Sequence, residues 1–214
     1  FTATSAVTVT GLVVVDTGSV FTPFGQGVIA LLIQLGGLGL MTFAVVTLMA
    51  LGNKVGFIQK TVTKAAFNQT DTSTLVNTAK SVLLFALIVE SIGVVILTWY
   101  WLPEMGLQKS FFHALFYTIR AFNNAGFVLS PNSLMQYVDD PVVNLTITGL
   151  FIIGGLGFTV LMDLYKSKRW AKLSPYSKLM LISTVIINVI ALLLIYAIEY
   201  DNPKTLQPLS EVGK

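Results

Sequence analysis

The stretch Gln34-Leu35-Gly36-Gly37-Leu38-Gly39 lies in an apolar run that carries no charge between Thr17 and Asn53. A similar cluster, Gly154-Gly155-Leu156-Gly157, recurs 118 positions later. A shorter segment ending in a glycine precedes each cluster, with Gly11 and Gly126 standing 25 and 28 residues before them. Two copies of a short segment, a glycine turn and a long apolar helix indicate a membrane pore built by repetition, because a ring of backbone carbonyls around an ion needs several such copies.

The composition is that of an integral membrane protein. Hydrophobic residues make up 54% of the 214 residues and charged residues only 11%, whereas a soluble domain carries about 25% charged residues. The chain has no cysteine and a single histidine, His113, which excludes disulfides, thiolate or His-rich metal sites and a cysteine nucleophile. We therefore expect no cofactor and no enzymatic activity, since an intramembrane enzyme needs a nucleophile with a base, or a metal.

Four segments are apolar enough to cross a bilayer, which takes about 20 helical residues. They are residues 24–51, 81–102, 141–162 and 179–198. We expect helices because lipid offers no partners for backbone polar groups. Trp99, Tyr100 and Trp101 end the second span and are typical of an interfacial aromatic belt.

The charges of the loops orient these spans. Nine of the 13 basic residues lie in the loops between spans one and two and between spans three and four: Lys54, Lys60, Lys64, Lys80, Lys166, Lys168, Arg169, Lys172 and Lys178. The positive-inside rule makes this side cytoplasmic and turns both glycine turns outward. Seven of the ten acidic residues lie on the outer side, where they would concentrate cations. Because the basic residues are sorted by membrane side, the net charge of +3 does not indicate nucleic-acid binding.

Residues 109–122 place apolar side chains at helical spacing but are too few to cross the membrane. Spans two and three must run in opposite directions, so this segment has to return to the side from which it starts. A re-entrant half-helix with an extended return satisfies that requirement. Residues 2–10 are similar to the tail of an equivalent half-helix, because Ala6 and Ala121 stand at the same offset from Gly11 and Gly126.

The candidate potassium selectivity filter consists of Thr8, Val9, Thr10 and Gly11 and of Asn123, Asn124, Ala125 and Gly126. A potassium ion must exchange its water shell for oxygens, which backbone carbonyls in a ring supply. Glycine suits such a turn because it tolerates positive φ and leaves the lumen open. The alternative is that each glycine merely ends a helix, and two copies at matching offsets favour the filter.

The remaining singled-out residues have structural interpretations. Helix packing by small residues is favoured over a hinge for Gly36, Gly37, Gly39, Gly154, Gly155 and Gly157. Glu90, within span two, must face protein and have a partner; a buried anchor bonded to pore-loop amides or to Arg120 is favoured over a cation or proton site. Arg120 is expected to brace the half-helix, since a cation in the path would repel potassium. His113 is expected to cap that helix or to lie at the interface.

These motifs, above all Phe1–Met41 and Phe112–Phe127, resemble the Ktr/Trk/HKT superfamily of potassium transporters, most closely the membrane subunits of the sodium-dependent bacterial Ktr systems. The resemblance implies an all-α polytopic, potassium-channel-like fold of four M1–P–M2 units with re-entrant pore loops, in which Gly11 and Gly126 are two of four filter glycines. It also implies potassium as the permeant ion and sodium as an activating ion. The implied setting is a homodimer in the lipid bilayer of the cell membrane, on a KtrA-like ring of cytoplasmic nucleotide-binding subunits.

The resemblance divides the chain into parts of successive units. Residues 1–53 would be the end of pore loop one with M2 of unit one, 54–80 a cytoplasmic loop, 81–165 unit two, 166–178 a basic cytoplasmic loop, and 179–214 M1 of unit three with an extracellular tail. We therefore expect a piece of a longer protein that does not close a pore alone. Two alternatives stay open: a Trk-type subunit, and a secondary cation transporter with discontinuous helices.

Overall fold

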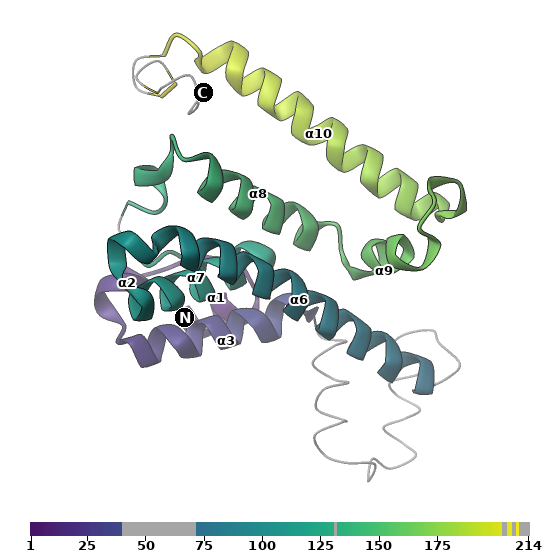
Figure 1. Cartoon of the computed structure of the whole chain (residues 1–214), viewed down its shortest axis with the longest axis horizontal. Helices are drawn as coiled ribbons and strands as arrows, with labels where there is room; N and C mark the ends of the chain where they lie inside the picture. The colour runs from purple at the N-terminus through teal and green to yellow at the C-terminus, as the bar shows by residue number, and fades with distance from the viewer. Residues whose placement is uncertain (40–71, 131, 203–204, 207–208, 210–214) are drawn as a thin grey trace.

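The computed structural model describes residues 1–39, 72–130, 132–202, 205–206 and 209, and these form helices and turns without a strand. Figure 1 shows the arrangement of the helices. They are α1 (Thr2–Val7), α2 (Thr17–Val20), α3 (Pro23–Gly37), α6 (Thr72–Met105), α7 (Leu107–Phe122), α8 (Pro141–Gly155), α9 (Phe158–Ser167) and α10 (Pro175–Glu199), with single 3-10 turns η1 (Met135–Tyr137) and η2 (Trp170–Lys172). The prediction of a helical fold is confirmed for this part of the chain.

Three of the long helices begin with the same local signal, a capping side chain followed by proline. Thr22, Asp140 and Ser174 precede the prolines of α3, α8 and α10. The Asp140 carboxylate accepts hydrogen bonds from the backbone N–H groups of Val142 and Val143 at 3.0 and 3.2 Å. A cap satisfies N–H groups that have no partner in the first turn, and proline loses no hydrogen bond there.

The structure agrees with some of the four predicted spans and not with others. Lys80–Met105 and Pro175–Glu199 are each long and apolar enough to cross a bilayer. Of the first span, 24–51, the structure describes α3 as helix, and the residues from 40 onward lie outside the described ones. The third span, 141–162, was predicted as one helix, and this is wrong: α8 and the following helix meet at 95°. The break falls at Gly157, whose φ of +77° is incompatible with a continuing right-handed helix.

The core forms around α7. This helix packs against α6, α8 and α3, while α1 packs against α3. Ala114, Phe116, Tyr117 and Ala121 of α7 are buried. The predicted half-helix 109–122 is therefore a helix from Leu107 to Phe122 that packs among α3, α6 and α8, whereas α10 lies apart and contacts α9 (Figure 1).

Trp101 departs from the expected aromatic belt. Its side chain is only 1% exposed, and its ring centroid lies 5.7 Å from that of Tyr117 and 5.5 Å from that of Tyr137. Trp99, two positions earlier, is 79% exposed. The helical turn thus places one tryptophan inside the core and the other on the surface, which a cluster of adjacent aromatics does not reveal.

The glycine clusters receive the ends of the two short helices. A Cβ atom on Gly36 would lie 1.9 Å from the carbonyl oxygen of Val7, the last residue of α1. A Cβ atom on Gly154 would lie 1.7 Å from the carbonyl oxygen of Phe122, the last residue of α7. Both contacts are to backbone, so a side chain at either position would displace a helix end.

The third glycine of each cluster has a different environment. Gly39 and Gly157 have φ values of +82° and +77°, and a Cβ atom on either would meet nothing within 4 Å. Close packing was predicted for all six glycines. At these two positions the structure replaces it with a backbone conformation that favours glycine.

The first prediction concerns stability. We expect Gly36→Ala and Gly154→Ala to lower the free energy of unfolding by about 1–3 kcal/mol, because the new methyl group overpacks against backbone. Gly27→Ala in α3 and Gly149→Ala in α8 are matched controls, since a Cβ atom there meets nothing within 4 Å. These controls should be neutral or stabilising by about 0.4–1 kcal/mol. Thermal unfolding of the detergent-purified full-length protein measures the difference, and equal behaviour within each pair would contradict the packing argument.

Candidate functional site: two matching glycine turns

The four-residue turns Thr8–Gly11 and Asn123–Gly126, here called the first and second glycine turns, have the same backbone hydrogen bonds. In the first, the N–H of Thr10 donates to the carbonyl of Ser5 at 3.0 Å and that of Val9 to Ala6 at 3.2 Å. In the second, 115 residues later, the N–H of Ala125 donates to Arg120 at 2.8 Å and that of Asn124 to Ala121 at 3.1 Å. This pair of bonds is a Schellman motif, which satisfies the carbonyls at a helix C-terminus.

The backbone angles match as well. Val9 and Asn124 have φ values of +55° and +56°, and Gly11 and Gly126, two residues later, have +71° and +73°. Asparagine visits this left-handed region readily, whereas for a β-branched valine it is an outlier. Such strain costs of order 1–3 kcal/mol and persists where the surroundings hold it, often at functional sites.

The two turns touch each other through their backbones. A Cβ atom on Gly11 would lie 2.4 Å from the carbonyl oxygen of Ala125 and 3.1 Å from the Cα of Gly126. A Cβ atom on Gly126 would lie 3.4 Å from the Cα of Gly11. The structure therefore brings the two predicted filter segments together and leaves no room for a side chain at Gly11.

The electrostatics of the turns favour a cation. Each turn follows the C-terminus of a helix, where the helix dipole carries partial negative charge. The hydroxyls of the first turn are engaged within their own segment: Thr8 Oγ1 donates to the carbonyl of Thr4 at 2.8 Å, and Thr10 Oγ1 lies 2.9 Å from Ser5 Oγ. Within the described part of the chain, no group of three or more His, Cys, Asp or Glu side chains could hold a metal. Backbone oxygens are thus the available ligands at the turns.

Arg120 is tied down beside the second turn. Its guanidinium donates to the carbonyl of Phe127 and lies 4.6 Å from the ring centroid of Tyr117, while its own carbonyl accepts from Ala125. One residue thus bonds to the chain on both sides of Gly126. The other charged candidate, Glu90, makes no bond to it, so the proposed pairing of Glu90 with Arg120 is not what forms. His113 stacks on Tyr117 at 6.2 Å between ring centroids.

Glu90 instead accepts hydrogen bonds from two amides. Gln34 Nε2 donates to its Oε2 at 2.9 Å, and Asn123 Nδ2 lies 3.5 Å from its Oε1. Asn123 Nδ2 also donates to Gln34 Oε1 at 2.9 Å and to the carbonyl of Ile119 at 2.8 Å. Glu90 and Asn123 are buried. The three side chains come from α6, α3 and the second glycine turn.

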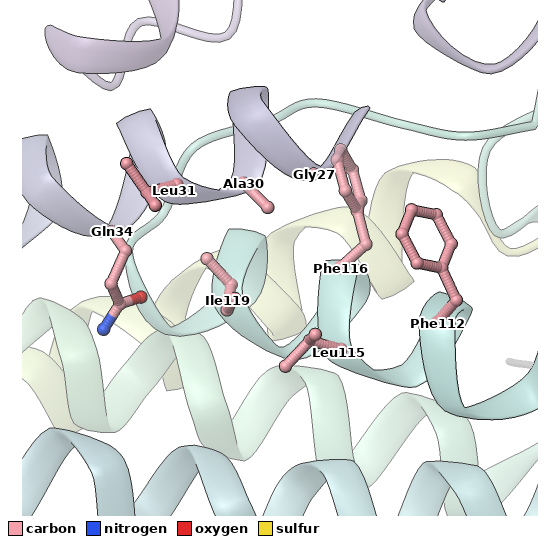
Figure 2. A pocket seen from close by; sticks show the side chains of 8 residues that line it. All are labelled: Gly27, Ala30, Leu31, Gln34, Phe112, Leu115, Phe116 and Ile119. Carbon is pink, nitrogen blue, oxygen red and sulfur yellow. The ribbon is translucent and has the colours of Figure 1, made fainter. Parts of the chain in front are cut away.

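Gln34 is the residue to which sequence reasoning gave no role. It lies at one end of an apolar pocket of about 300 Å³ between α3 and α7, and Figure 2 shows its amide pointing away from the helix that carries it. The available signal was a lone amide inside an uncharged run, two positions before the first glycine cluster. Its partners are 56 and 89 residues away, so the sequence alone did not reveal them.

The second prediction tests the left-handed residue of the turn. We expect Asn124→Ala to be less stable than Asn124→Gly by about 1 kcal/mol, because alanine resists positive φ. Both variants lose the amide contact to the Phe151 carbonyl, so their comparison isolates the backbone. At exposed Thr148, within α8, the order should reverse by about 1 kcal/mol in favour of alanine. Thermal unfolding gives both orders, and a Thr148-like order at Asn124 would refute the assignment.

The chain matches the TrkH family, described as cation transport protein, over residues 1–198. It is 50% identical to Ktr system potassium uptake protein B of Bacillus subtilis (strain 168) and 44% identical to the protein of that name from Vibrio alginolyticus, in each case over 100% of this chain and 48% of the relative. It is 35% identical to potassium/sodium uptake protein NtpJ of Enterococcus hirae, over 91% of this chain and 42% of that protein. The chain thus spans about half the length of the curated relatives it matches. With its helical architecture and two matching turns, it belongs to the TrkH family of cation transport proteins.

Proposed function

We propose that this chain forms part of a potassium uptake protein in which dehydrated potassium permeates selectively through a ring of backbone carbonyls. The observation that carries the proposal is the contact between two glycine turns of equal backbone conformation, each at the C-terminus of a short helix. The printed names of the relatives supply the ion, since both Ktr proteins are potassium uptake proteins.

The ligands in this proposal are the carbonyl oxygens of the first and second glycine turns. Positive φ at two of the four residues in each turn rotates the peptide planes, which lets neighbouring carbonyls point toward one ion. Carbonyls replace the hydration shell of potassium, and several sites in a row let the ion leave as readily as it enters. The C-terminal ends of α1 and α7 add negative potential. Transport is passive in this mechanism, and no side chain carries the ion.

Two turns do not make a ring, so we assign them to two of four repeated units. Residues 1–53 then hold the end of pore loop one and M2 of unit one, 81–165 hold unit two, and 179–214 hold M1 of unit three with an outer tail. The equal contacts of Gly36 and Gly154 with the ends of α1 and α7 support this division. The remaining two filter glycines would come from sequence beyond this half.

The proposed setting is the cell membrane, with the pore loops outward and the basic loops, 54–80 and 166–178, in the cytoplasm. Relatives named as parts of a Ktr system support partner components, and we assign a KtrA-like nucleotide-binding ring and a homodimer to them. The basic stretch Lys166–Lys172 suits either that ring or anionic lipid. Sodium is the proposed activating ion; the name of the Enterococcus relative, a potassium/sodium uptake protein, connects sodium with a related protein as an ion that is taken up.

The secondary-transporter alternative is less favoured on a specific observation. That mechanism uses ionisable residues along the path, and Glu90, the charge within the predicted spans, is engaged by two amides. A Trk-type subunit remains the nearer alternative, because the filter turns serve both types.

The third prediction tests the filter. In the full-length protein, expressed in cells that lack their own potassium systems, Gly126→Ser should reduce the preference for potassium over sodium by roughly tenfold or more, because strain of about 1–3 kcal/mol falls on the ring. Rubidium and sodium uptake at matched membrane abundance measure the preference, with and without external sodium. Gly106→Ser is the matched control: its φ is +73°, and a Cβ atom there meets nothing within 4 Å. Equal ion preference in the two variants would contradict the filter assignment.

The fourth prediction tests the orientation of the chain in the membrane. It uses single cysteines introduced into a stretch that has none of its own, with the parent protein as the labelling background. Gln136 and Lys172 are exposed and lie on opposite proposed sides. A membrane-impermeant maleimide should label Gln136→Cys in intact cells but label Lys172→Cys only after permeabilisation. The reverse pattern would invert the topology, and equal labelling of both residues would refute it.

A further inference from the structure

The amide and carboxylate cluster of Gln34, Glu90 and Asn123 joins three separate helical segments. Gln34 belongs to α3, Glu90 to α6, and Asn123 caps α7 as the first residue of the second glycine turn. In the proposed division, α3 is M2 of unit one and the other two segments are unit two. The cluster therefore crosses the boundary between two repeated units at the level of the filter.

The direction of each hydrogen bond in the cluster, from donor to acceptor, is fixed by the carboxylate. A carboxylate only accepts hydrogen bonds, so Glu90 makes Gln34 present its Nε2 and turn its Oε1 toward Asn123. Asn123 must then present its Nδ2, which also reaches the carbonyl of Ile119. A buried charge at one end thus determines which way two amides point, a choice that amides alone leave open.

The backbone of α3 at Gly37 also contacts the side chain of Asn123. A Cβ atom on Gly37 would lie 1.9 Å from Asn123 Oδ1. The oxygen end of the Asn123 amide therefore packs directly against the backbone of α3 at Gly37. The nitrogen end is bonded as described. Asn123 is held from both ends by residues of other helices, and its own backbone N–H continues α7 by bonding to Ile119 at 3.1 Å.

The internal repeat lacks this cluster at the equivalent positions. Alignment of the glycine clusters pairs Gln34 with Ile152, and alignment of the glycine turns pairs Asn123 with Thr8. Ile152 has no amide, and the Thr8 hydroxyl bonds within its own helix to Thr4. Among the residues that the structure describes, the cluster therefore distinguishes one unit boundary and is not a shared property of the repeat.

We propose that Gln34 and Glu90 are positioning residues that lock the second glycine turn to the M2 helix of unit one, so that ion preference depends on a donor at one of these two positions being matched by an acceptor at the other. The inference rests on the proposed function, because it needs the turn to be part of the filter. This role explains why Glu90 is buried: Glu90 orients Asn123 and does not contact the permeating ion. Selectivity is then set partly by side chains that never touch potassium.

The test exchanges carboxylate and amide in the full-length protein. Gln34→Glu places two carboxylates within hydrogen-bond distance and removes the donor to Glu90. The hydrogen bond between positions 34 and 90 is therefore lost. Gln34→Glu with Glu90→Gln restores it with the charge moved: the amide at 90 donates to the carboxylate at 34, which still accepts from Asn123. Gln26→Glu is the matched control, because Gln26 is buried on the same helix but bonds to the carbonyls of Thr17, Gly18 and Phe21.

The readout is the ratio of rubidium to sodium uptake at matched membrane abundance. We expect Gln34→Glu to lower it about tenfold, the counterpart of one lost hydrogen bond to a charged group, and the double variant to recover most of the loss. Gln26→Glu should lower abundance and leave the ratio unchanged. A double variant no more selective than Gln34→Glu, or a wild-type ratio in Gln34→Glu, would overturn the inference.

Two further outcomes can be distinguished: a Gln34→Glu variant that does not reach the membrane, and a wild-type protein that takes up no rubidium. Where Gln34→Glu does not reach the membrane, Glu90→Gln decides, because it is neutral and of equal size; a reduced ratio supports the lock, and a wild-type ratio refutes it. Failure of the wild-type protein to take up rubidium at all would refute the proposed function and this inference with it.

Discussion

The site depends on one constraint, the contact of the last carbonyls of α1 and α7 with glycines of α3 and α8. Val7 meets Gly36 and Phe122 meets Gly154, each so closely that a single methyl group would strike the carbonyl oxygen. This contact fixes where α1 and α7 end, and the Schellman bonds then fix the next residues in the left-handed region. The glycines that close the two turns, Gly11 and Gly126, then lie against each other. A glycine in α3 or α8 thus helps to determine the geometry of a backbone turn in another segment.

The strain in the first turn shows how firmly this contact holds. Val9 adopts a φ of +55°, a region that a β-branched residue avoids, while the equivalent Asn124 reaches it with less cost. The positive φ of Val9 could not be predicted from the sequence, because valine by itself favours an extended conformation. Two backbone hydrogen bonds from Val9 and Thr10 to the preceding helix and the adjacent α3 leave it no alternative. In the first turn, the geometry that the two turns share is therefore imposed by packing and not by local propensity.

Sequence reasoning succeeded where a signal was local and repeated. Helical spacing predicted α7, and the matching offsets of Ala6 and Ala121 correspond to two buried residues before turns of equal shape. It failed where one signal permits two outcomes. The same glycine cluster that allows close packing at Gly154 also permits the break at Gly157, and neighbouring tryptophans divide between surface and core. The roles of Gln34 and Glu90 depend on partners 33 to 89 residues apart, which no local pattern encodes.

In the division proposed above, the described residues contain one complete boundary between repeated units, and this bears on how the proposed ring of four would be selective. Equal turns alone would give equal positions around an ion, and each position would be free to shift with its own helix. The boundary between α3 and α7 carries a buried polar connection that the repeat does not reproduce in Ile152 or Thr8. A buried carboxylate with two oriented amides is costly to assemble and hard to satisfy in any other arrangement. Such a cluster suits the fixing of register, because a small displacement of the turn breaks several hydrogen bonds at once, whereas apolar packing tolerates small shifts. In the proposed ring, this one connection would set where the second turn stands relative to the first.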